Sequence, residues 1–125
     1  MDNSNKIAYL GFIQGAINRM GNNSFLVKGF AITLISALVA TLDDKYCFIF
    51  IPTIMFWLLD TYYLHQERLF RKLYEKVIDG TEPDNSFSMN AQKYENEVSS
   101  FLNVMMSKTL SPFYGGLIIV LMIIM

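Results

Sequence analysis

The feature that most constrains the fold is an apolar run at residues 25–42, in which Lys28 is the only charged side chain. In an α-helix, which rises ~1.5 Å per residue, these 18 residues span about 27 Å, close to the ~30 Å hydrocarbon core of a bilayer. A second apolar run, residues 46–64, contains only one charge, Asp60, and its helical pattern continues beyond it. We therefore predict two transmembrane helices, at 25–42 and 46–64, the second continuing as a cytoplasmic helix to residue 79.

A third apolar run, residues 110–125, is too short to cross a bilayer by itself. We extend its helix backwards and predict a helix over residues 90–125 that leads into a third span, with a kink at Pro112. The chain is 53% hydrophobic and 17% charged, whereas soluble domains are about 25% charged. The sequence therefore predicts one all-α integral membrane domain over residues 1–125, with about three transmembrane helices.

Two further segments predict a small cytoplasmic helical collar. Residues 3–20 form an amphipathic pattern that is typical of a helix lying in the membrane interface or packing on a partner, and residues 21–24 supply a helix stop and an N-cap. After the second span, an apolar seam recurs at helical spacing until Gly80, which ends the helix before a loop at 81–86. The positions on the apolar face are Ile7, Leu10, Ile13 (or Gln14), Ile17 and Met20 in the first segment, and Leu69 or Phe70, Leu73 and Val77 in the second.

The distribution of basic residues predicts the orientation. Lysine and arginine gather in the N-terminal segment and in residues 65–108, whereas the turn at 43–45 holds one base and two acids. Because basic loops stay in the cytoplasm, the N-terminus and residues 65–108 should face the cytoplasm, with the C-terminus on the opposite side.

The two charges within the spans predict an ion pair near the cytoplasmic membrane interface. Lys28 and Asp60 are equally far along the chain from Asp44, so in an antiparallel hairpin they lie at about the same depth. Pairing would satisfy two charges that are costly in lipid. The alternative is that each side chain reaches the headgroups separately.

Catalytic constellations are missing from the sequence. His65 and Glu67 spell H-x-E, but a zinc deaminase also needs a P-C-x-x-C motif, and Cys47 is the only cysteine. We expect no enzyme activity, no metal site and no cofactor.

A face of small residues on the first span has two interpretations. Small and hydroxyl side chains at Thr33, Ser36 and Ala40 recur at helical spacing. Such a face lets helices pack closely. Alternatively, it lines a narrow pore, which three thin spans can enclose only as a homo-oligomer.

A basic stripe beyond the second span also has two interpretations. Arg68, Arg71, Lys72 and Lys76 lie on neighbouring positions of one helix. They can contact membrane lipid headgroups. In a ring of subunits they would instead form a basic vestibule that binds a phosphate-rich ligand.

Three segments carry a resemblance to a known family: IAYLGFIQGAINRMGNNSFLVKGF at 7–30, FWLLDTYYLHQERLFRKLYEKV at 56–77, and FSMN at 87–90. Together they resemble the small membrane effectors of Hailong-type anti-phage defence systems. The resemblance implies a homo-oligomeric ion channel in the bacterial inner membrane, controlled by a nucleotide or oligonucleotide made by a partner nucleotidyltransferase. It assigns no ligand residues, so the basic stripe is our own assignment.

Two other functions remain open from the sequence. One is a non-conducting membrane anchor or partner subunit, in which the small-residue face only packs helices. The other is a holin-like toxin that disrupts the membrane without a ligand.

Overall fold

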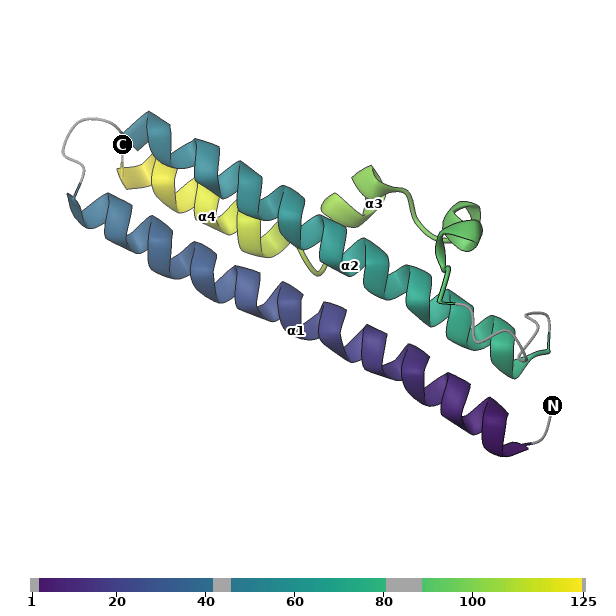
Figure 1. The fold of residues 1–125 in the computed structure, drawn as a ribbon. Coiled ribbons are helices and arrows are strands. Elements are labelled where there is room, and N and C mark those ends of the chain that lie inside the picture. Colours follow the sequence, from purple (N-terminus) through teal and green to yellow (C-terminus); the bar gives the residue numbers. More distant parts are fainter. Residues whose placement is uncertain (1–2, 42–45, 81–88, 125) are drawn as a thin grey trace.

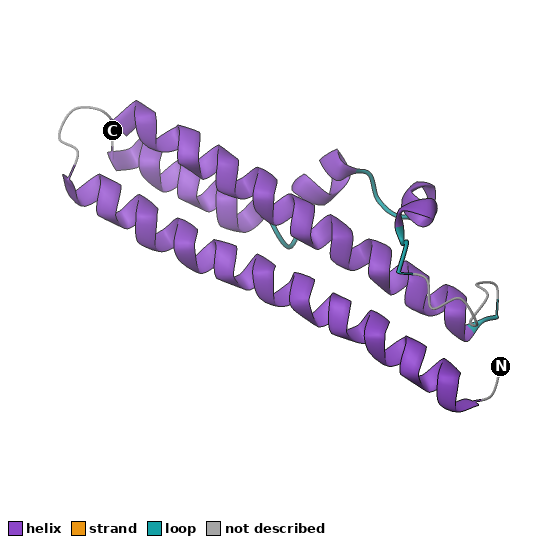
Figure 2. Cartoon of the chain, viewed as in Figure 1, coloured by secondary structure: helices purple, strands orange, loops and turns teal. Residues whose placement is uncertain are grey.

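The computed structural model describes residues 3–41, 46–80 and 89–124, and these residues form only helices and their connections (Figures 1 and 2). The all-α prediction is therefore confirmed. The expected turn at 43–45 and the loop at 81–86 lie outside the described residues. In chain order the elements are α1 (Asn3–Thr41), the 3-10 helix η1 (Tyr46–Ile49), α2 (Phe50–Ile78), the 3-10 helix η2 (Gln92–Glu97), α3 (Phe101–Met105) and α4 (Ser111–Ile124).

Helix α1 is a single helix of 39 residues, so the predicted helix stop at 21–24 is wrong. The residues there are weak helix formers, but tertiary contacts override that preference. Gly21 lies against Glu67, whose Oε1 would be 3.4 Å from an added Cβ, and Ser24 donates a hydrogen bond to Asp60. Residues 3–20 are thus the first half of the long helix and not a separate helix.

Helices α1 and α2 form an antiparallel hairpin, and η2 packs on the end that contains residues 3–20 and 65–78 (Figure 1). We call this end the stalk. Ile13 and Ile17 of the predicted amphipathic face are buried in the stalk core, as expected, but Ile7 is 68% exposed. The buried residues of the stalk core come from α1, α2 and the segment around η2: Tyr9, Ile13, Ile17, Leu69, Leu73, Val77, Ala91 and Tyr94.

Helix α2 runs without interruption from the apolar half of the hairpin into the stalk, as predicted. The seam consists of Leu69, Leu73 and Val77, all of which are buried, whereas Phe70 is only partly buried. The helix ends at the expected place, because Gly80 adopts a positive φ of 82° and its N–H binds the carbonyl oxygen of Val77.

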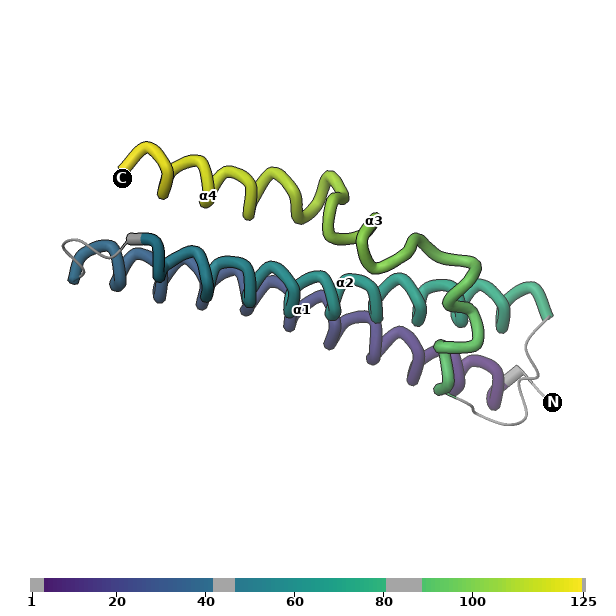
Figure 3. The backbone as a smooth tube through the Cα atoms, turned by 90° about the horizontal axis from the view of Figure 1, so that it is seen from above, coloured from purple at the N-terminus to yellow at the C-terminus, as the bar shows by residue number. Residues whose placement is uncertain are grey.

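The continuous helix predicted over residues 90–125 is wrong. Residues 98–100 separate η2 from α3, and a further turn separates α3 from α4. Pro112 lies in the first turn of α4, where its missing N–H costs little, instead of kinking a helix interior. Figure 3 shows that α3 and α4 lie together on one side of the hairpin.

Two helices of the described chain are long and apolar enough to cross a membrane: Ser4–Thr41 and Cys47–Ile78, the second beginning within η1. Only 22% and 28% of their most apolar windows are buried, so neither is the core helix of a globular fold formed by this chain alone. Helix α4 is apolar but has 14 residues, which gives it a length of about 21 Å, less than the ~30 Å hydrocarbon core. Its C-terminal end lies beside the start of α2, at the end of the hairpin away from the stalk (Figure 1).

The continuity of α1 predicts opposite effects for two glycine substitutions. Gly21→Ala should raise the free energy of unfolding by about 0.5–1 kcal/mol, because alanine is the better residue in a helix interior. Gly80→Ala should lower it by about 1 kcal/mol, because φ is positive there. Reversible unfolding in bicelles measures both. A loss of stability in Gly21→Ala as large as that in Gly80→Ala would show that the helix is interrupted at residue 21.

Candidate functional site

The structure brings the two predicted membrane-interface charges together. Lys28 Nζ of α1 lies 2.7 Å from Asp60 Oδ2 of α2. The Asp60 side chain has no exposed surface, whereas 21% of the Lys28 side chain is exposed. The carboxylate is therefore the more deeply buried charge of the pair, and Lys28 reaches it from the edge of the helix packing.

Three donors from two other helices surround the Asp60 carboxylate. From α1, Ser24 Oγ donates to Oδ1 and Lys28 Nζ lies against Oδ2. From α4, the Tyr114 hydroxyl donates to Oδ2 over 2.9 Å. Lys28 also donates to Ser24 Oγ over 3.0 Å, which closes the network. We call these four residues the Asp60 cluster.

The ring of Tyr114 also stacks on the indole of Trp57. The rings of Trp57 and Tyr114 stack with centroids 5.8 Å apart and planes 8° from parallel. Trp57 Nε1 also donates to the carbonyl oxygen of Met105, at the end of α3, over 2.9 Å. The Asp60 cluster and Trp57 thus connect α1, α2, α3 and α4 at one level of the hairpin.

Sequence reasoning missed two members of the Asp60 cluster. Ser24 was expected to cap a helix, although it lies one helical turn before Lys28 and so shares its face. That spacing was a usable signal. Tyr114 carried no such signal, because its position depends on how α4 folds back onto the hairpin.

The predicted pore-lining residues lie on the face of α1 that points away from α2. Ala31 and Ile35 of α1 are buried in the hairpin, whereas Thr33, Ser36 and Ala40 are exposed. The Thr33 hydroxyl donates to the carbonyl oxygen of Gly29 within its own helix, over 2.9 Å. The small-residue face therefore does not mediate packing inside one chain.

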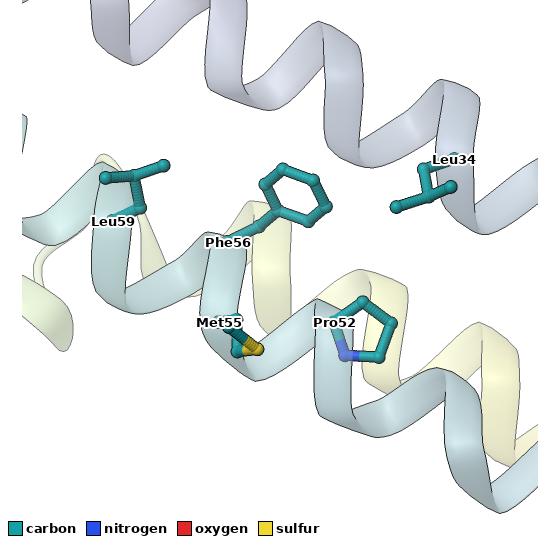
Figure 4. Close-up of a pocket in the computed structure, with 5 residues that line it drawn as sticks. All are labelled: Leu34, Pro52, Met55, Phe56 and Leu59. Atoms are coloured by element: carbon teal, nitrogen blue, oxygen red, sulfur yellow. The ribbon is translucent and has the colours of Figure 1, made fainter.

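Two apolar grooves flank this face. On one side, Leu34 and Phe56 are common to two adjoining hollows between α1 and α2, each of about 420–430 Å³. Figure 4 shows the first of these hollows. Thr33 lines the second of these hollows. On the other side, Ser36 lines a groove of about 230 Å³ between α1 and α4. Thr33 and Ser36 thus border different grooves, and the small-residue face is the ridge between them.

The predicted basic stripe forms one wall of an open groove of about 280 Å³ in the stalk. Arg68, Arg71 and Lys72 line it together with Ser99 and two glutamates. Lys76 lies outside the groove. The residues that complete the lining are Glu75, Glu97 and Val98.

Most of the positive charge of this stripe is neutralised by neighbouring acids. Three ion pairs join Arg71 to Glu67 at 3.0 Å, Lys72 to Glu75 at 3.6 Å, and Lys76 to Glu97 at 3.1 Å. The first two pairs lie within α2, whereas Glu97 of the third comes from η2. Within the stripe, Arg68 is the one base that forms no ion pair with the described acidic residues.

The other residues that the sequence singled out lie apart from these sites. His65 is buried, and its ring lies edge-on to Phe101 with centroids 6.3 Å apart. Cys47 is exposed at the other end of the hairpin. No group of three potential metal ligands was found within residues 3–41, 46–80 and 89–124.

Comparison with known proteins identifies no relative: no family model, curated protein or solved structure matches the chain.

The burial of Asp60 predicts an asymmetry between single and double substitutions. Lys28→Met alone should lower the free energy of unfolding by about 3 kcal/mol, because it leaves a buried carboxylate without its counter-charge. Lys28→Met combined with Asp60→Asn should cost less, because the amide is neutral and keeps an oxygen for Tyr114.

Reversible unfolding in bicelles measures these differences. The control is Lys108→Met, which removes an exposed lysine and should change stability by no more than about 0.5 kcal/mol. A double variant at least as unstable as Lys28→Met would contradict the asymmetry.

Proposed function

We propose that this chain is the subunit of a homo-oligomeric ion channel in a bacterial inner membrane, opened from its stalk by a nucleotide or oligonucleotide. The observation that carries the proposal is that the small-residue face points outward from the hairpin. Thr33, Ser36 and Ala40 lie on an apolar helix, point away from their own hairpin and present a weakly polar surface. In a ring of subunits such a surface can line a narrow pore whose conduction depends on helix separation.

The exposed apolar surface supports membrane insertion and self-association. Large side chains on every helix of the apolar half lie open, including Phe30 at 63%, Met55 at 64% and Ile123 at 78%. A monomer in water rarely exposes contiguous apolar surface of this extent. Lipid and further copies of the chain are the partners that we propose for it.

The orientation follows from the position of the stalk. The stalk holds Arg68, Arg71 and Lys72 of α2 and the polar N-terminal part of α1, so the positive-inside rule favours a cytoplasmic stalk. The end of α4 would then lie toward the opposite side. In this proposal α3 and α4 together take the place of the third transmembrane helix expected from the sequence.

Support for the ligand comes from Arg68 and from the resemblance to Hailong-type effectors. Arg68 borders the stalk groove with Arg71, Lys72 and the Ser99 hydroxyl, a set that suits a phosphate group. Because Glu67 and Glu75 already pair with two of these bases, one chain offers little net charge, and a ring of stalks would be needed to concentrate it. The implied partner is a nucleotidyltransferase that makes the ligand in response to phage infection.

Larger side chains on the small-residue face test whether that face lines a pore. Thr33→Leu with Ser36→Leu should abolish ion flux in liposomes, because leucine replaces the small polar side chains with bulk. Ile119→Phe adds bulk at an exposed position of α4 that lines none of these grooves and should leave flux intact. Unchanged flux in the double variant would show that other residues line the pore. Absence of flux in the inserted, assembled wild-type protein, with or without ligand, would support a membrane anchor.

Reversing the charge of Arg68 tests whether the stalk groove binds the proposed ligand. Arg68→Glu should weaken binding of a fluorescent mixed-sequence DNA oligonucleotide to protein in nanodiscs by about tenfold or more, because a charge-assisted hydrogen bond is lost. Arg19→Glu makes the same charge change at an exposed position of α1 and should leave binding nearly unchanged. Equal losses in both variants would indicate general electrostatic attraction. Flux that never needs the oligonucleotide would favour the holin-like toxin.

A further inference from the structure

The hairpin has two separate apolar cores, and a layer of buried polar groups lies around the boundary between them. The stalk core takes Ile17 as its last contribution from α1, and the core of the apolar half begins on α1 at Ala31. On α2 the corresponding limits are Leu69 and Leu64. Four of the five buried polar residues in the described chain lie at this boundary. Ser24 and His65 fall within the intervals, whereas Asp60 and Thr61 come about one helical turn before Leu64, on the side of the apolar half.

Most of the polar groups in this layer are satisfied by α1 and α2, and α4 adds one hydrogen bond. The Thr61 hydroxyl donates to the carbonyl oxygen of Trp57 in its own helix. Asp60 receives Ser24 and Lys28 from α1. The remaining donor to Asp60 is the Tyr114 hydroxyl, which also makes the one side-chain hydrogen bond from α4 to the hairpin among the described residues.

The stalk core needs nothing from α4, because all its members come from α1, α2 and the segment around η2. Helix α4 contributes only to the core of the apolar half, through Leu121, Tyr114 and two partly buried neighbours. Its opposite face is open, with Ile119 59% and Ile123 78% exposed. Helix α4 thus packs on the hairpin along one face only. A hydrogen bond to a buried charge is worth more to its docking than a neutral one.

We propose that the hydrogen bond from Tyr114 to Asp60 is a latch that holds α4 on a hairpin whose stalk is complete without it. Breaking the bond releases α4 while α1 and α2 stay paired. This inference goes beyond the proposed channel and does not depend on conduction or on a ligand.

The test compares the thiol-labelling rates of two buried cysteines, one beside the start of α4 and one in the stalk. Leu110→Cys reports on the docking of α4, because Leu110 has no exposed surface and directly precedes that helix. Ala16→Cys reports on the stalk, because Ala16 is also fully buried. Each is made in a Cys47→Ser background and labelled with a maleimide in nanodiscs.

Tyr114→Phe removes only the hydroxyl and should speed labelling at Leu110→Cys by about tenfold or more, since the open fraction rises with the lost bond to a charged group. Labelling at Ala16→Cys should stay unchanged. The matched control, Tyr63→Phe, removes a hydroxyl from α2 one turn away from Asp60 and should change neither rate.

Two outcomes would overturn the latch. An unchanged rate at Leu110→Cys in Tyr114→Phe would mean that apolar packing alone holds α4. Equal acceleration at both reporters would mean that the hydroxyl stabilises the whole fold and does not act on α4 separately.

Discussion

The arrangement of this protein depends on one buried carboxylate. Asp60 has no exposed surface and directly follows the apolar part of α2, so its charge must be compensated within the chain. Lys28 and Ser24 provide that compensation from α1, and Tyr114 provides it from α4. Sliding α1 along α2 by one turn would separate Lys28 from Asp60. The cluster therefore fixes the register of the hairpin and the position of the third helix together, a role in which a buried ion pair contributes specificity more than stability.

Fixing the register also determines which residues remain on the outside. With Ala31 and Ile35 directed into the hairpin, the ridge that contains Thr33 and Ser36 faces outward between two apolar grooves. A packing role for this ridge must therefore involve another molecule. The proposal of a pore at a subunit axis assigns the ridge to the centre of an oligomer and the bulky outer side chains to lipid.

The sequence was sufficient for features that depend on local periodicity or on a simple count along the chain. The α2 seam at Leu69 and Leu73 and the ion pair at Lys28 are of this kind. It was insufficient where tertiary contacts decide: residues 21–24 read as a helix stop, but contacts with Glu67 and Asp60 keep them helical. The ion pair between Lys76 and Glu97 and the place of Tyr114 depend on η2 and α4 folding back, which no local pattern encodes.

The central claim is that the ridge of α1 faces water inside an oligomer. It is tested most directly with Ser36→Cys in a Cys47→Ser background, reconstituted in liposomes and treated with a charged, water-soluble thiol reagent during ligand-switched ion flux. We predict rapid modification and block of the flux, with slow modification and no block for Ile119→Cys on the exposed face of α4, which we assign to lipid. Modification of Ser36→Cys as slow as that of Ile119→Cys, with the flux undiminished, would contradict it.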